Sequence, residues 1–368
     1  MRFLTAGESH GPALTAIIEG LPAGLCLNVD RIDQMLVRRQ QGVGSSNRME
    51  IESDKVSITS GLRHGETLGS PLAITIQNRD WENWKEIMDP WQKPRDVMGK
   101  RTVPRPGHAD LAGMIKYKRA DARDILERAS ARETAIRTAV GAICKELLFE
   151  LDVDVSGYVI SIGEVSAKTF DCGPESSPVR CPDKEASLSM TKLIEQAKLH
   201  GETLGGIIEV KTSKLPVGLG SHVHWDRRLD SRIAGAMMSV PAIKGVEIGL
   251  GFEATRRVGS QVMDSILPGF KRSTNHMGGV EGGISNGEPI VVRCGMKPLP
   301  TVRRPVPSID METGNVTGAA TERSDVCAVP RAAVVCEAVL AIELARVLVE
   351  RFGGDTLWEI KERVQKNS

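Results

Sequence analysis

The chain has 368 residues, of which 40% are hydrophobic and 26% are charged. These proportions are close to those of globular proteins and exclude a disordered chain, a collagen and a long coiled coil. The formal net charge is only +1, whereas proteins that bind nucleic-acid phosphates usually carry a strongly basic surface. We therefore expect no nucleic-acid partner, and any positive site must be local.

The N-terminal residues and the cysteines indicate where the protein resides. The chain begins MRFLTAGESHG, without the apolar segment of a signal peptide, and no stretch reaches the roughly 20 apolar residues that span a bilayer. The cysteines are odd in number and form no CxxC pair, which is typical of free thiols in a reducing compartment. We expect a cytoplasmic protein without a membrane partner.

Hydrophobic periodicity predicts strands and helices that alternate along the chain. The predicted strands are Leu14–Glu19, Lys55–Ser60, Leu72–Gln77, Val155–Ile162, Gly206–Thr212, Glu247–Phe252 and Pro289–Cys294. The predicted helices are Asp33–Gln40, Ala120–Leu151, Met190–His200, Ser231–Val240 and Ala332–Phe352. The pattern indicates a mixed α/β protein, which we take as a single domain over residues 1–368.

The sequence contains an internal echo. Residues 7–25, GESHGPALTAIIEGLPAGL, resemble residues 201–219, GETLGGIIEVKTSKLPVGL, and an Asp-Arg pair typical of a helix start follows each copy. We hypothesise a duplicated strand-turn-helix unit that gives the domain approximate two-fold symmetry. Chance similarity between two glycine-rich turns is the alternative.

Three segments are predicted to be mobile loops near a site. They cover about 40–50, 80–107 and 256–287 and are rich in glycine, proline or polar residues, with little periodicity. Long loops in a compact domain are usually functional.

The motif Gly7-Glu8-Ser9-His10-Gly11 places a histidine between glycines that let the backbone approach a ligand closely. His10 could donate a proton to a leaving group. It could equally be a turn residue that caps a neighbouring strand.

Several motifs carry arginines whose planar groups match carboxylate and phosphate oxygens. Arg38 and Arg39 precede a Gly/Ser loop that carries Arg48, and prolines stiffen the segment that contains Arg105 and His108. Each motif taken alone also fits an ordinary solvated surface. His108 could ligate zinc, but the sequence offers no HxxxH or CxxC partner, so we expect no metal.

Two further segments add possible anion contacts. Ser130 can cap the helix that follows it, whose free amides attract anions, although a helix with surface ion pairs is the alternative. Lys297 lies beside two prolines, and Arg323 would keep Asp325 ionised and able to accept a proton.

Together these strings resemble the chorismate synthase family along nearly the whole chain. The motifs that carry the resemblance are GESHG, RRQ with its glycine-rich loop, RPGHAD, ERASARET, SQVMD, GGISNG, MKPLPT and ERSD. The resemblance implies conversion of 5-enolpyruvylshikimate 3-phosphate to chorismate by 1,4-anti elimination of phosphate, the seventh step of the shikimate pathway. This reaction needs reduced FMN without net redox change. It also implies an α/β (α+β) sandwich, with a helical layer between antiparallel sheets, and a homotetramer.

The resemblance also implies roles for individual residues. His10 would protonate the departing phosphate, His108 would stabilise the reduced flavin, and Asp325 would help to take the substrate proton through the flavin. The implied substrate-binding residues are Ser9, Arg39, Arg48, Arg105, Ser130, Arg132 and Arg323. The implied flavin contacts are Arg128, Ala129, Ser130, Ala242, Gly282, Lys297, Pro298, Leu299, Pro300, Thr301 and Arg323.

The sequence departs from the family pattern at two places. Pro241 stands where an asparagine is common before the alanine, and in the loop after Arg39, Val43 and Ser45 replace a usual tyrosine and arginine. Family members with their own flavin reductase carry extra sequence, so we expect an external, NADP-linked source of reduced flavin.

Two other functions remain open. One is a flavin oxidoreductase with net hydride transfer, although no GxGxxG joins a strand to a helix. The other is an anion- or nucleic-acid-binding module, which salt-dependent DNA binding would identify.

Overall fold

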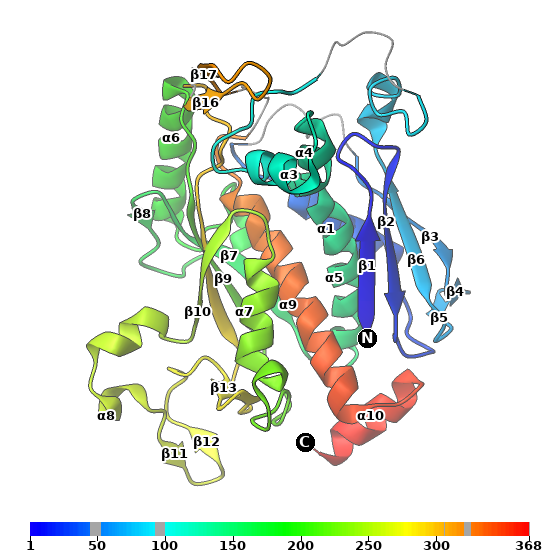
Figure 1. The fold of residues 1–368 in the computed structure, drawn as a ribbon. Coiled ribbons are helices and arrows are strands. Elements are labelled where there is room, and N and C mark those ends of the chain that lie inside the picture. The colour runs from blue at the N-terminus through cyan, green and yellow to red at the C-terminus, as the bar shows by residue number, and fades with distance from the viewer. Residues whose placement is uncertain (45–52, 93–99, 305, 320–324, 368) are drawn as a thin grey trace.

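The computed structural model describes residues 1–44, 53–92, 100–304, 306–319 and 325–367. They form a sandwich in which a layer of helices lies between two antiparallel sheets (Figure 1). The predicted fold class is confirmed. Within the described ranges, no helix is long and apolar enough to cross a membrane.

The first sheet has the strand order β1-β2-β6-β3, with every pair antiparallel. Its strands are β1 (Arg2–Ala6), β2 (Ala13–Glu19), β6 (Leu72–Gln77) and β3 (Val56–Ser60). Alternate residues such as Leu14, Ile18 and Ile74 are fully buried, because one face of this sheet packs on the helices.

The second sheet has the order β10-β15-β9-β7-β8 and is also antiparallel. Its strands are β10 (Ile243–Ile248), β15 (Val291–Met296), β9 (Gly206–Thr212), β7 (Val155–Ile162) and β8 (Val165–Ser166). Helix α6 (Lys184–His200) contacts the edge strand β8.

The middle layer contains α1 (Val29–Gln40), α5 (Thr134–Phe149), α7 (Leu229–Met238) and α9 (Val329–Phe352). Helices α1 and α5 contact the first sheet, while α7 and α9 contact the second (Figure 1). Helix α9 is apolar on nearly every side because it packs against both a sheet and other helices. At Gly141 of α5, an added Cβ would lie 2.4 Å from the Cβ of Ala338 in α9, so glycine permits this close crossing.

Shorter elements surround this sandwich. The remaining helices are α3 (Asp110–Tyr117), α4 (Arg123–Ala129), α8 (Gly259–Val262) and α10 (Leu357–Lys366). Small hairpins are formed by β4 (Leu62–Arg63) with β5 (Glu66–Thr67), β11 (Ile266–Leu267) with β12 (Lys271–Arg272), β13 (Val280–Glu281) with β14 (Ile284–Ser285), and β16 (Pro307–Ile309) with β17 (Val316–Gly318). Turns of 3₁₀ helix cover Arg79–Asn83, Ala131–Glu133, Pro174–Ser176, Trp225–Arg227 and Gly251–Arg256.

Most predicted strands are confirmed to within a residue or two, but Glu247–Phe252 is wrong in position. Strand β10 ends at Ile248 because the chain leaves the sheet at Gly249. Its φ is +61°, and an added Cβ would lie 2.1 Å from the His276 carbonyl oxygen. The strand predicted over Pro289–Cys294 lies two residues later.

The single predicted helix Ala120–Leu151 is also wrong. Helix α4 ends at Ala129, Ser130 has extended backbone (φ −64°, ψ 144°), and α5 begins at Thr134. The Ser130 hydroxyl accepts the Arg132 amide, so the predicted cap is confirmed at the short 3₁₀ turn. This break turns residues 129–132 towards a cavity described below.

The ends of the helices depend on caps that hydrophobic spacing does not report. Helix α1 begins before the predicted Asp33 because Asn28 caps it, and α6 begins before Met190 because Asp183 caps it. Strand β1 and helices α3 and α10 were not predicted.

The two copies of the sequence echo occupy equivalent places. Strands β2 and β9 each have a neighbour on both sides in their own sheet, and each is followed by a Leu-Pro turn and then by a helix of the middle layer, α1 or α7. This arrangement agrees with the hypothesised duplication.

The structure gives partial detail on the predicted loops. The segment 256–287 contains α8 and two hairpins, while parts of 40–50 and 80–107 lie outside the described residues. Their mobility stays a prediction.

Candidate active site

A cavity of about 670 Å³ lies where helices α5 and α9 begin. Its volume is in the range of small-molecule sites. Predicted site residues that line it are Ser9, His10, Arg39, Arg105, His108, Ala129, Ser130, Arg132, Ala242, Lys297, Leu299, Pro300, Thr301 and Asp325. Segments from across the chain therefore meet at one place.

Other predicted site residues are not brought into this lining. The Arg128 side chain is directed to backbone oxygens of β1 and the following turn. Gly282 lies in the exposed β13–β14 turn, and Pro298 is flanked by lining residues without lining the cavity itself. Arg48 and Arg323 lie outside the described residues.

His10 is held by Glu127 of α4. Its Nδ1 lies 2.9 Å from both carboxylate oxygens of Glu127, and its backbone amide donates to the same carboxylate at 2.9 Å. Burial raises the pKa of Glu127, but the bonds to His10 and the charge of Arg123 outweigh it and lower the pKa overall. Glu127 is therefore a carboxylate that fixes the His10 ring.

His108 is held in a similar way by Asp110, at the start of α3. The His108 Nδ1 lies 2.5 Å from Asp110 Oδ1, and the Arg105 Nε donates to Asp110 Oδ2 at 2.8 Å. Burial raises the pKa of Asp110, but His108 and Arg105 together bring it well below its usual range. One buried carboxylate thus orients both a histidine and an arginine of the cavity.

A second buried carboxylate, Asp54, bridges two cavity arginines. It is 2% exposed. The Arg132 Nη1 donates to it at 2.7 Å, and the Arg39 Nη1 lies 3.5 Å away. The Arg39 Nε also donates to Thr134 Oγ1 at 3.0 Å. These bonds fix two guanidinium groups against one wall of the cavity.

Arg331 is a cavity residue that the sequence reasoning missed. It forms an ion pair with Asp325. Burial and the neighbouring Arg39 lower the pKa of Arg331 to about 9. The ion pair holds the Asp325 carboxylate in a defined position among the arginines of the cavity.

Part of the cavity lining combines cations with apolar side chains. The Lys297 amide donates to the Ala242 carbonyl at 3.0 Å, and Ala242 has a φ of +69°. Burial and the neighbouring Lys244 lower the pKa of Lys297. The apolar lining residues are Leu126, Met238, Val240, Ile243, Leu299 and Val335. An aromatic ring system with a phosphate tail fits such a surface, because the apolar part covers the ring and the cations neutralise the phosphate.

The cavity as a whole is electropositive. Its cationic lining residues are Arg39, Arg105, Arg132, Lys244, Lys297 and Arg331, whereas Asp325 contributes the single carboxylate among the described lining residues. The first turns of α5 and α9 also face it, and helix N-termini favour anions. The arrangement can bind a polyanion and exchange protons with it.

Four residues were not predicted from the sequence because they act through other side chains: Glu127, Asp110, Asp54 and Trp84, whose indole stacks on the His10 ring. Glu127 and Asp110 stand inside motifs that were recognised, ERASARET and RPGHAD, and their carboxylates next to histidine-bearing segments were a usable signal. Asp54 and Trp84 carried no such signal.

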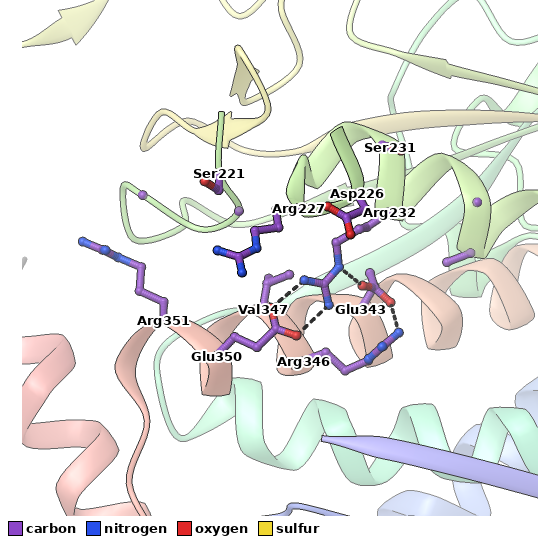
Figure 2. A pocket seen from close by; sticks show the side chains of 14 residues that line it. Ser221, Asp226, Arg227, Ser231, Arg232, Glu343, Arg346, Val347, Glu350 and Arg351 are labelled. Atoms are coloured by element: carbon purple, nitrogen blue, oxygen red, sulfur yellow. Dashed lines mark hydrogen bonds and ion pairs between the residues drawn. The ribbon is translucent and has the colours of Figure 1, made fainter. Parts of the chain in front are cut away.

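A larger cavity of about 840 Å³ lies between α7 and α9 (Figure 2). Figure 2 shows that carboxylates neutralise its central arginines: Arg232 binds both Glu343 and Glu350, at 2.6 Å and 2.5 Å. No histidine is found among its described lining residues. It therefore lacks the proton-transfer groups of the first cavity.

The described residues were also compared with the ligand groups that bind metal ions. In the part of the chain that the structure describes, no three His, Cys, Asp or Glu side chains are grouped as metal ligands.

Comparison with known proteins gives a consistent result. The family model described as chorismate synthase matches residues 1–349. The chain is 56% identical to the chorismate synthase of Syntrophotalea carbinolica, covering 99% of this chain and 97% of that protein, and 54% identical to that of Trichlorobacter lovleyi, covering 98% and 97%. A crystal structure of chorismate synthase aligns with a TM-score of 0.80 and 44% identity, covering 99% of this chain and 96% of the other. With its fold, its electropositive cavity and its sequence all in agreement, the chain belongs to the chorismate synthase family.

Proposed function

We propose that the chain catalyses the 1,4-anti elimination of phosphate from 5-enolpyruvylshikimate 3-phosphate to give chorismate, as a carbon–oxygen lyase of the shikimate pathway. The observation that carries this proposal is the cavity itself, which gathers two carboxylate-bound histidines, an arginine-bound aspartate and several cations. The substrate carries a phosphate and two carboxylates, so it requires such a concentration of positive charge.

The charged residues of the cavity and His10 have distinct roles in this proposal. Arg39, Arg132 and Arg331 bind anionic groups of the substrate. Their carboxylate partners, Asp54 and Asp325, hold them in place before it arrives. His10 donates the proton that neutralises the departing phosphate. Asp325 helps to take up the proton that the cyclohexene ring of the substrate loses. The predicted contributions of Arg48 and Arg323 belong to the same proposal.

Reduced FMN is the proposed cofactor. When bound, it would supply the electron density that allows the carbon–oxygen bond to break, although the proton lost in the 1,4-elimination is not acidified by an adjacent carbonyl group. The apolar wall, Lys297 and the loop to Thr301 would hold it, with His108 at its ring system. The reduced flavin comes from an external, NADP-linked reductant. The predicted contacts of Arg128, Pro298 and Gly282 remain to be tested.

We also propose a cytoplasmic homotetramer. Two features support an assembly. The 3₁₀ turn Gly251–Arg256 and the β11–β12 hairpin expose large apolar side chains, with Phe252 71%, Ile266 69% and Phe270 89% exposed. Apolar patches of this kind mark interfaces. Gly282, a proposed flavin contact, lies away from the cavity of its own chain. Light scattering of the purified protein measures the assembly directly.

The test of the function is anaerobic. Purified protein, chemically reduced FMN and 5-enolpyruvylshikimate 3-phosphate are mixed, and chorismate absorbance and phosphate release are followed together. Equal amounts of both products with the flavin still reduced would support the elimination. Stoichiometric flavin oxidation would instead favour the oxidoreductase, and no turnover would refute the proposal.

A further inference from the structure

We propose that Glu127 and Trp84 are positioning residues for His10, an inference that rests on the role of His10 as proton donor in the proposed function. Glu127 accepts the Nδ1–H of the imidazole and Trp84 stacks on the ring, so that Nε2 is the nitrogen that delivers the proton to the leaving phosphate.

Glu127 clamps the turn that carries His10 at three points. Its backbone carbonyl accepts the Ser9 amide at 3.0 Å, its carboxylate accepts the His10 amide at 2.9 Å, and both carboxylate oxygens lie 2.9 Å from Nδ1. The carboxylate is ionised and 3% exposed, so it can only accept hydrogen bonds. A carboxylate in this position fixes the ring orientation and requires the proton on Nδ1.

Trp84 fixes the other degree of freedom, the tilt of the ring. Its indole stacks on His10 with centroids 4.0 Å apart and an interplanar angle of 30°. The Trp84 Nε1 donates to Asp80 at 3.0 Å, and the Arg123 guanidinium lies 4.8 Å from the Trp84 ring centroid. Arg123 also donates to Glu127 at 2.9 Å. Indole, guanidinium and carboxylate therefore form one cluster around the imidazole.

The cluster has a chemical consequence. As the carbon–oxygen bond breaks, its electron pair passes to the phosphate oxygen, and the Nε2–H proton of the imidazolium moves to that oxygen. His10 is then a neutral imidazole that keeps its Nδ1–H on Glu127, and it regains the Nε2 proton from solvent. Without the carboxylate, the neutral ring could hold its remaining proton on either nitrogen, and its orientation would vary.

The experiment compares Glu127→Gln, Trp84→Phe and Trp84→Ala with wild type. We expect kcat of Glu127→Gln to fall about 100-fold, within the usual contribution of a positioned general acid, with little change in the KM for the substrate. Trp84→Ala should lose about 10-fold in kcat, and Trp84→Phe, which keeps an aromatic face, should recover most of that loss.

Matched controls separate positioning from loss of fold. Glu146→Gln removes a buried helix carboxylate that binds Arg31, and Trp225→Phe changes an indole that is 71% exposed. Neither residue lines the cavity, so both variants should retain wild-type kcat. In a His10→Ala background, Glu127→Gln should cause no further loss in kcat, because a positioning residue has no effect without the group that it positions.

A second readout does not depend on turnover. In protein labelled with ¹⁵N-histidine, the neutral His10 ring should carry its proton on Nδ1 in wild type and lose that preference in Glu127→Gln. An Nε2–H tautomer in wild type would overturn the inference. The inference would also be overturned if wild type is active and Glu127→Gln has the same kcat. An inactive wild type would instead refute the proposed function, and with it the proton delivery assigned to His10.

Discussion

Replacement of Glu337 by glutamine should strongly destabilise the fold. Glu337 lies in α9 with 0% exposure. Its carboxylate accepts two bonds from Arg38, at 2.9 and 3.0 Å, one from Lys145 at 2.6 Å and one from the Gly157 amide at 3.1 Å. Burial raises the pKa of Glu337, but Arg38 and Lys145 outweigh it and lower the pKa overall. This carboxylate therefore joins α1, α5, β7 and α9.

The size of the effect follows from what Glu337→Gln leaves behind. Breaking a buried ion pair by removing one partner costs about 3–5 kcal/mol. Arg38 retains Glu175, and the Lys145 side chain is 25% exposed, so we expect the lower end, about 3 kcal/mol. For a chain of this length, that corresponds to a fall in Tm of roughly 4 °C.

The assay is thermal and urea unfolding followed by circular dichroism, with Glu195→Gln on the exposed face of α6 as control. Because the folded-state pKa of Glu337 is depressed, its stabilisation is present above the ordinary value of 4.5 and is lost as the pH falls through the folded value. The difference in Tm between Glu337→Gln and wild type should therefore become smaller below about pH 4.5. A Tm within 1 °C of wild type at neutral pH would refute the reasoning.

Two further changes test the packing and the site. Gly141→Ala should destabilise the fold by about 1–3 kcal/mol in urea unfolding, since the new Cβ would overlap Ala338. The control Gly235→Ala, whose Cβ meets nothing within 4 Å, should be neutral or stabilising by up to about 1 kcal/mol. Equal effects of the two substitutions would argue against the close crossing of α5 and α9. Asp54→Asn should raise the KM for the substrate about 10-fold with a smaller change in kcat, because Arg39 and Arg132 lose their shared carboxylate; an unchanged KM in steady-state kinetics would contradict that role.

Local sequence patterns predicted a mixed α/β protein, whereas the sandwich and most cavity residues were predicted from the resemblance to the chorismate synthase family. Alternating apolar residues mark strands such as β2 and β9, and the motifs that carry His10, Arg105 and Lys297 contain their chemistry within a few positions. The break at Ser130 was not predicted because apolar residues continue on both sides of it, and periodicity alone does not register one extended residue.

The residues that hold the site could not be predicted in the same way. Glu127 meets His10 across 117 positions of sequence, and Arg132 meets Asp54 across 78. Their partners are set by how the sheets and helices come together, so only the folded chain identifies them. Arg331 was not predicted for the same reason, since it lies at the start of α9, a largely apolar and buried helix whose sequence indicates packing and not a site.

The two similar segments, residues 7–25 and 201–219, have different surroundings. The turn before β2 carries His10, while the turn before β9 has Leu204 at the equivalent position. Thr203 donates to the Leu299 carbonyl at 2.8 Å, and the Leu204 amide donates to the Val326 carbonyl at 2.9 Å, next to Asp325. One segment thus contributes a side chain to the cavity lining, and the other supports two segments that line it, so similar parts of the fold can serve a site that has no symmetry.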